Sequence, residues 1–230
     1  MRLLIANARA DGWTGFIRHR KVLQYTDAQG REITARQVQE AVECKRVLFA
    51  VHGYRTENEK AEDAYDRWQG KLSGCGYEVM IGFRWPGGWA RAAFALSQRR
   101  TDEAGRHMAT AIAQTQLADH VTVMAHSLGA DVTLHGWQAV RAFSPQFSAA
   151  WKRTVFVAPA IPWDAELPPN STVCYSPNDG ALKWYGRRHL WTRKAMGLHG
   201  PKPGLVARRE KFEGDHSDYF DDARFLEVLS

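Results

Sequence analysis

The chain has 230 residues, 44% of them hydrophobic and 24% charged, which is typical of a single soluble globular domain over residues 1–230. Its three cysteines are widely scattered, which argues against a disulfide framework and against a metal site and favours a reducing, cytoplasmic compartment. No apolar run reaches the roughly 18 residues of a membrane span, and the net charge of +6 accompanies no nucleic-acid-binding motif, so neither kind of partner is expected.

Residues 1–45 differ in pattern from the rest of the chain. The stretch Gly15–Thr34 indicates an extended segment with a turn near Asp27–Gly30, and a helix follows towards Val42. We predict that residues 1–45 form an antiparallel addition at the edge of a sheet.

Five short apolar runs, rich in β-branched and aromatic residues, follow this segment. They are residues 46–51, 77–85, 120–125, 154–159 and 171–176. Apolar runs without alternation suit strands that are buried on both faces, as in a parallel sheet. The spacing of apolar residues predicts helices over 57–72, 101–117 and 128–143. Strands that alternate with helices indicate an α/β fold with a mostly parallel central sheet flanked by helices.

The segment 183–210 lacks a regular pattern. It carries large aromatic residues, among them Trp184, Tyr185 and Trp191, together with Arg187 and Arg188. Because it is too long for an ordinary connection, we predict that it is a binding loop or a lid.

Ser127 stands between a predicted strand and a predicted helix, in the sequence Ala125-His126-Ser127-Leu128-Gly129. Small residues two positions away on either side fit a sharp turn in which neighbouring backbones come close together. Such a turn places the hydroxyl at a helix N-terminus, where the helix dipole favours developing negative charge. Serine is also a common helix N-cap, so this motif alone leaves a structural and a catalytic role open.

The turn resembles the nucleophile elbow G-x-S-x-G of the α/β-hydrolases, with Ala125 in place of the first glycine. The strand VLFAVHGY, residues 47–54, resembles the oxyanion-hole loop of that superfamily, which implies backbone N–H donors at Tyr54 and Leu128. Together with the segments FRWPGG, YSPND and HSDYF, the resemblance runs from Arg46 to Ser230 and is greatest to a little-characterised bacterial branch.

The resemblance implies an acid and then a histidine after the serine in chain order. Asp179, in the tight turn Asn-Asp-Gly after the fifth strand, is the expected acid, and Asp164 is the alternative one strand earlier. His216, just before a predicted C-terminal helix, is the expected base, and His199 is its rival. The insertion 183–210 then lies between the acid and the base.

Two other histidines have structural interpretations. His52 precedes the serine and ends the oxyanion strand, and His126 stands beside the serine, so we expect both to be packing residues.

The implied activity is hydrolysis of carboxylic esters through a Ser-His-Asp triad and an acyl-enzyme, with no metal or organic cofactor. Trp85, Trp184 and Tyr185 are expected to line the substrate site, with Arg187 and Arg188 near an anionic group of a small ester. Thioester and amide hydrolysis use the same triad, so esters are the default expectation. The alternative is a catalytically inactive α/β-hydrolase-fold binding or scaffold module with a basic surface.

Overall fold

The structure is a computed structural model that describes residues 1–8, 23–54, 58–87, 94–143, 150–183, 194–205 and 207–230. Its strands are β1 (Arg2–Asn7), β2 (Gln24–Asp27), β3 (Glu32–Ile33), β4 (Arg46–Val51), β5 (Val79–Arg84), β6 (His120–His126), β7 (Trp151–Val157), β8 (Ser171–Tyr175) and β9 (Ala207–Lys211). Its helices are α1 (Ala35–Val42), α2 (Asn58–Leu72), α3 (Phe94–Arg99), α4 (Thr101–Ala113), α5 (Gly129–Phe143), α7 (Met196–His199), a 3-10 turn (Asp218–Asp221) and α8 (Ala223–Leu229).

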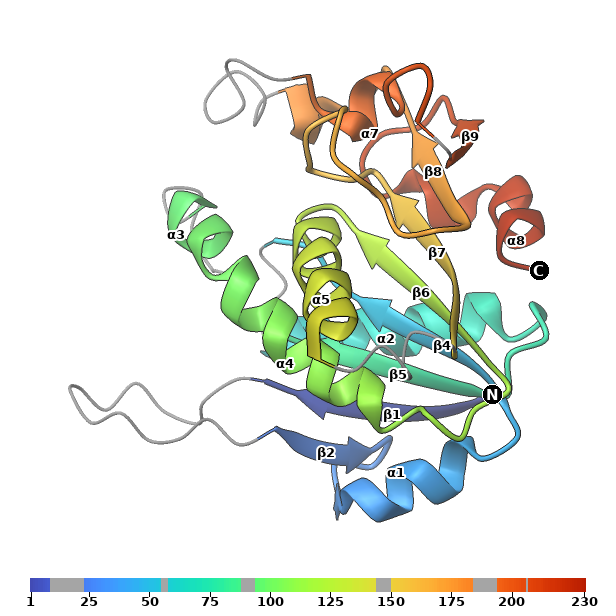
Figure 1. The fold of residues 1–230 in the computed structure, drawn as a ribbon. Helices are drawn as coiled ribbons and strands as arrows, with labels where there is room; N and C mark the ends of the chain where they lie inside the picture. Colours follow the sequence, from blue (N-terminus) through green and yellow to red (C-terminus); the bar gives the residue numbers. More distant parts are fainter. Residues whose placement is uncertain (9–22, 55–57, 88–93, 144–149, 184–193, 206) are drawn as a thin grey trace.

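All strands within the described ranges belong to one sheet, in the order β3-β2-β1-β5-β4-β6-β7-β8-β9. β1 and β2 pair antiparallel, as do β2 and β3. All the other pairs of neighbouring strands in this order, from β1-β5 to β8-β9, are parallel. Because the parallel strands point the same way, the loops at their carboxyl ends gather at one edge, where α/β sheets bind ligands (Figure 1).

Helices cover both faces of the sheet. Buried side chains of α1, α4 and α5 pack with one face, and those of α2, the 3-10 turn and α8 pack with the other. Figure 1 shows α4 and α5 in front of the sheet and α2 behind it. Residues of the central strands are buried on both faces, which is why their sequences lack alternation. Burial of one leucine- or phenylalanine-sized side chain stabilises the folded state by about 1.5–3 kcal/mol, relative to leaving that side chain exposed.

The predicted α/β architecture is confirmed, and β4 to β8 correspond to the five predicted strands. α2 and α5 lie where helices are predicted, whereas α4 ends at Ala113, before the predicted end at residue 117. Two strands were not predicted. Arg2–Asn7 forms β1, which pairs in parallel with β5, and Ala207–Lys211, assigned to an irregular loop, forms β9 beside β8.

β9 is an edge strand of this sheet. The side chains of Arg208, Arg209 and Lys211 are exposed along it. Arg208 forms an ion pair with Glu210, and Lys211 forms one with Glu213. Three of the basic residues of the chain therefore lie on this edge strand.

Tyr65 of α2 fixes the backbone at the ends of β4 and β5. Its ring lies against Gly82 so closely that an added Cβ would be 2.5 Å from the ring. Its hydroxyl donates to the carbonyl of Phe83 at 2.6 Å and accepts from the N–H of His52 at 3.3 Å. The loop that follows β4 therefore starts from a fixed point.

Among the helices that the structure describes, none has the length and apolar character of a membrane span.

Candidate active site

Ser127 directly follows β6, in the turn that leads into α5. Its φ of +54° is a left-handed conformation, which costs a non-glycine residue about 1–2 kcal/mol. Hydrogen bonds hold it there: the Ser127 N–H donates to the Val157 carbonyl at 2.9 Å, and the Ser127 carbonyl accepts from Ala130 and Ala160 at 3.1 and 3.0 Å. Strain that is fixed from several sides is typical of functional positions.

Three side chains from separate loops form a continuous chain of hydrogen bonds. The Nδ1–H of His216 donates to Oδ2 of Asp179 at 2.7 Å, since a carboxylate oxygen accepts. With the proton on Nδ1, Nε2 is placed to accept from the Ser127 hydroxyl at 2.9 Å. Ser127 is 4% exposed and Asp179 is fully buried, so water competes little for these bonds. The structure thus brings together the three side chains that the sequence singles out.

Asp179 is fixed by its second oxygen as well. Oδ1 accepts from the N–H of Leu182 at 2.8 Å, so the carboxylate also caps the helical turn that begins at Gly180. The alternative acid, Asp164, is exposed in a turn after β7, and no hydrogen bond among the described residues joins it to His216. His199, the alternative base, is exposed on α7 and makes none to Ser127 within the same ranges.

The loop after β4 passes directly over the turn at Ser127. A Cβ added to Gly53 would lie 2.7 Å from Cβ of Ser127, and one added to Gly129 would lie 2.5 Å from the carbonyl oxygen of His52. Glycine at both positions allows this approach, because it carries no Cβ. The loop and the turn are therefore in direct contact, which an oxyanion hole built from their backbones requires.

Trp85 supports this loop from within the core. Its backbone N–H donates to Nε2 of His52 at 3.2 Å, and its indole N–H donates to the His52 carbonyl at 2.8 Å. The two rings stack with their centroids 5.6 Å apart. The Trp85 side chain is fully buried in this arrangement, and its expected contact with substrate stays a prediction. Sequence alone could not separate these roles, since an aromatic residue after a strand can turn inwards or outwards.

The same contacts orient the peptide before Tyr54. Because Nε2 of His52 accepts from Trp85, its Nδ1 carries the proton and donates to the Gly53 carbonyl at 2.8 Å. In a trans peptide the N–H of the next residue points the opposite way, so the Tyr54 N–H is turned away from the His52 ring. No hydrogen bond among the described residues uses the N–H of Leu128. The oxyanion role of Tyr54 and Leu128 stays a prediction.

A methyl group at Gly53 tests this contact. We expect Gly53→Ala to displace the loop, lower kcat at least about 10-fold and destabilise the fold by about 1–3 kcal/mol through overpacking. The matched control is Gly70→Ala in α2, where nothing lies within 4 Å of an added Cβ and where alanine should stabilise the helix by about 0.5–1 kcal/mol. Urea unfolding and ester turnover measure both effects. Equal behaviour of the two variants would contradict the close contact.

His126 contacts the base loop from beside the nucleophile. Its Nε2–H donates to the carbonyl of His216 at 3.0 Å, and the two rings lie 4.8 Å apart. Burial, reinforced by the neighbouring His216, lowers the pKa of His126 to about 3. His126 is therefore neutral at physiological pH and acts as a fixed donor, in agreement with the structural role expected for it.

This pKa predicts how stability depends on pH. An unfolded histidine titrates near 6.5, so between pH 6.5 and about 3 the unfolded chain binds a proton at His126 that the folded chain does not. The contribution of His126 therefore lowers stability as the pH falls through this window. Between pH 7 and 5 we expect wild type to lose about 2 kcal/mol more than His126→Gln, measured by urea unfolding. Identical losses in the two proteins would show that His126 titrates normally.

Asp215 is a site residue that the sequence reasoning missed. Its Oδ1 accepts from the N–H of His216 at 2.8 Å and from the N–H of Gly180 at 2.7 Å. The only signal in the sequence was its position next to His216, because Gly180 is distant along the chain. Trp184, Tyr185, Arg187 and Arg188 lie outside the described residues, so their role as substrate contacts stays a prediction.

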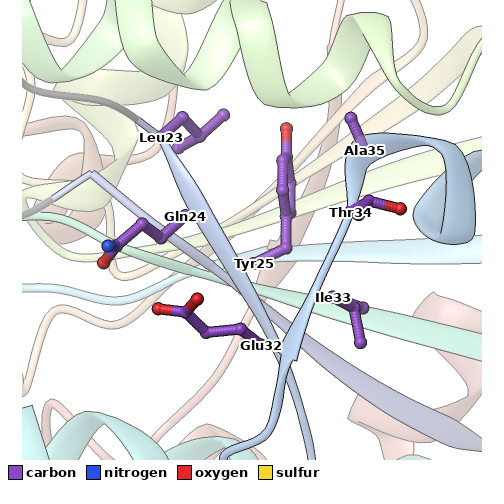
Figure 2. A pocket seen from close by; sticks show the side chains of 7 residues that line it. All are labelled: Leu23, Gln24, Tyr25, Glu32, Ile33, Thr34 and Ala35. Carbon is purple, nitrogen blue, oxygen red and sulfur yellow. The ribbon is translucent and has the colours of Figure 1, made fainter.

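A cavity of about 220 Å³ lies elsewhere, between β2, β3 and the start of α1 (Figure 2). Figure 2 shows the Tyr25 ring between Leu23 and Ala35. The Tyr25 hydroxyl is buried and has no hydrogen-bond partner among the described residues, and burial raises its pKa. Because β1, β5 and β4 separate β2 from β6 in the sheet, this cavity is not part of the site at Ser127.

Among the described residues, no cluster of acidic, histidine or cysteine side chains could hold a metal ion.

The sequence matches a protein family described as "Alpha/beta hydrolase of unknown function (DUF900)" over residues 28–187. The match spans more than half of the chain and includes Ser127 and Asp179, whereas His216 lies beyond it. A search of curated proteins found no match.

Several solved structures are similar to this chain at low sequence identity. An uncharacterized protein from Bacillus cereus ATCC 10987 has 15% identity and a TM-score of 0.48, over 82% of this chain and 58% of that one. A hyperthermophilic esterase from Pyrobaculum calidifontis has 13% identity and a TM-score of 0.46, over 82% and 75%. Apo esterase 2 from Thermogutta terrifontis has 12% identity and a TM-score of 0.46, over 82% of each chain. The chain therefore spans less than two thirds of the Bacillus protein.

Proposed function

This chain belongs to a family of alpha/beta hydrolases, and from that premise we propose that it is a serine hydrolase that cleaves carboxylic esters through an acyl-enzyme. The observation that supports the proposal is the hydrogen-bonded chain from the Ser127 hydroxyl through His216 to the buried Asp179. A hydroxyl, an imidazole and a carboxylate in this order are the groups that acyl transfer needs.

In the proposed reaction, Nε2 of His216 removes the proton from Ser127 as its oxygen attacks the ester carbonyl. The imidazolium that forms is stabilised by Asp179, which stays ionised. The backbone N–H groups of Tyr54 and Leu128 bind the oxyanion, a contribution of about 3–4 kcal/mol for each donor. His216 then returns the proton to the leaving alcohol, and water repeats the sequence on the acyl-enzyme. The residues described require no cofactor for these steps.

The proposed substrate is a small ester, and the proposed compartment is the cytoplasm. Free cysteines support the second point: Cys44 is exposed, and Cys75 and Cys174 are buried, without a disulfide. An ester is the default among acyl substrates because hydrolases of this superfamily most often act on esters. A screen of p-nitrophenyl esters of increasing chain length would define the acyl group.

Labelling with a fluorophosphonate probe tests the proposal directly. The probe reacts with serine only where a base activates the hydroxyl, so we expect one equivalent on Ser127, located by peptide mass spectrometry. Heat-unfolded protein is the control for chemical reactivity without the folded site. A folded protein that neither reacts with the probe nor cleaves any ester in the screen would instead favour a catalytically inactive binding or scaffold module.

A further inference from the structure

The acid and the base of the proposed triad are carried by two neighbouring loops. Residues 176–180 follow β8 and are called the acid loop here, and residues 213–216 follow β9 and are called the base loop. β8 and β9 pair in parallel, with Tyr175 opposite Lys211, so the two loops leave the sheet side by side. Their relative position decides whether Asp179 reaches His216.

Side chains join the two loops in both directions. The Ser176 hydroxyl donates to the Gly214 carbonyl at 2.6 Å, and Nδ2 of Asn178 donates to the Glu213 carbonyl at 2.9 Å. In the opposite direction, the carboxylate of Asp215 reaches the acid loop. Each of these bonds links a side chain of one loop to the backbone of the other, which fixes the chain path more firmly than a contact between two flexible side chains.

One oxygen of Asp215 joins the acid and the base. Oδ1 accepts both from the N–H of Gly180, the residue after the acid, and from the N–H of His216, the base itself. These two bonds lower the pKa of Asp215, so its carboxylate is ionised at neutral pH and accepts as a charged group. The N–H of Asp215 in turn donates to Oδ2 of Asp218 at 2.7 Å, which orients Asp215 from the far side.

The backbone of His216 is therefore held at both of its peptide groups. Its N–H is bound by Asp215, and its carbonyl accepts from His126. Fixing both peptides fixes the direction in which the imidazole leaves the chain. That direction places Nδ1 at 2.7 Å from Asp179 and Nε2 at 2.9 Å from Ser127.

We propose that Asp215 is a positioning residue, which locks the base loop to the acid loop and so holds His216 in line between Asp179 and Ser127. No hydrogen bond among the described residues joins the Asp215 side chain to Ser127 or to Asp179, and its bonds to the two loops go to the backbone N–H groups of Gly180 and His216. The consequence for turnover rests on the proposed function, whereas the geometry of the two loops does not.

Two substitutions separate a positioning bond from a charge effect. Asp215→Ala removes the acceptor, and we expect kcat to fall about 10- to 100-fold while KM changes less than about 3-fold, because misplacing a base slows the chemical step. Asp215→Asn keeps an oxygen at Oδ1, so kcat should return to within about 3-fold of wild type. The matched control is Asp63→Ala, an exposed aspartate on α2. An unchanged kcat in Asp215→Ala, or an equal loss in Asp215→Asn, would overturn the proposal.

A proton NMR measurement tests the geometry without turnover. The His216 Nδ1 proton in its short bond to Asp179 should give a low-field resonance, assigned by its absence in His216→Gln. We expect this signal to persist in Asp215→Asn and to broaden or disappear in Asp215→Ala. Persistence in Asp215→Ala overturns the positioning role alone, whereas absence of probe labelling in wild type overturns the proposed function alone.

Discussion

Ser127→Ala should lower kcat for ester hydrolysis by about 10⁴- to 10⁶-fold and abolish fluorophosphonate labelling, because the variant has no nucleophile and retains only binding and the oxyanion donors. The fold should be almost unaffected. The hydroxyl contributes one hydrogen bond, to His216, and alanine meets the same left-handed strain as serine at a φ of +54°. We expect the free energy of unfolding to change by no more than about 1–1.5 kcal/mol.

Single-turnover and steady-state rates on one p-nitrophenyl ester, together with urea unfolding, measure these effects. Ser73→Ala is a matched control, since this exposed hydroxyl bonds only to the carbonyl of Gly70 in the described contacts. A well-folded Ser127→Ala protein with wild-type turnover would rule out Ser127 as the nucleophile.

Asp179→Asn should lower kcat by about 10⁴-fold, the second-largest effect we expect. The variant keeps the shape of the side chain, and its oxygen can still accept from the N–H of Leu182. Its amide nitrogen would then face Nδ1 of His216 as a donor. Two donors cannot bond, so the ring adopts the tautomer with the proton on Nε2 and loses the ability to accept from Ser127.

Asp164→Asn is the control for this substitution and should leave kcat within about 2-fold of wild type, because Asp164 is exposed and is not bonded to His216. The kcat values of the two variants on the same ester decide between the two acids. The reverse ranking would assign the acid to the turn after β7 and leave the serine-hydrolase proposal intact.

Local pattern was sufficient to predict the centre of the sheet. β4 and β6 are apolar throughout because both faces are covered, and this signal needs no knowledge of the partner strands. β1 is as long as β4, but its parallel pairing with β5 joins residues far apart in sequence, which no local pattern reports. β9 reads Ala-Arg-Arg-Glu-Lys, which carries no apolar pattern because an edge strand can be solvated.

The candidate site also has some features that a local sequence pattern predicts and others that it does not. The order of serine, acid and histidine is a property of the sequence, and Ser127, Asp179 and His216 were predicted from it. The inward turn of Trp85 and the bond from Asp215 to Gly180 depend on which backbones come together in space. A single sequence contains no local signal for such contacts.

The charged edge strand β9 also affects whether a strand of another molecule can pair with this sheet. An edge strand offers unpaired backbone donors and acceptors, onto which a strand of another molecule can add. Arg208, Arg209 and Lys211 are exposed along this edge, and a second copy that paired there would have to strip these charged side chains, and the acidic partners of Arg208 and Lys211, of water. Charged side chains on an edge strand are a known device against edge-to-edge pairing of sheets, and β9 carries such side chains.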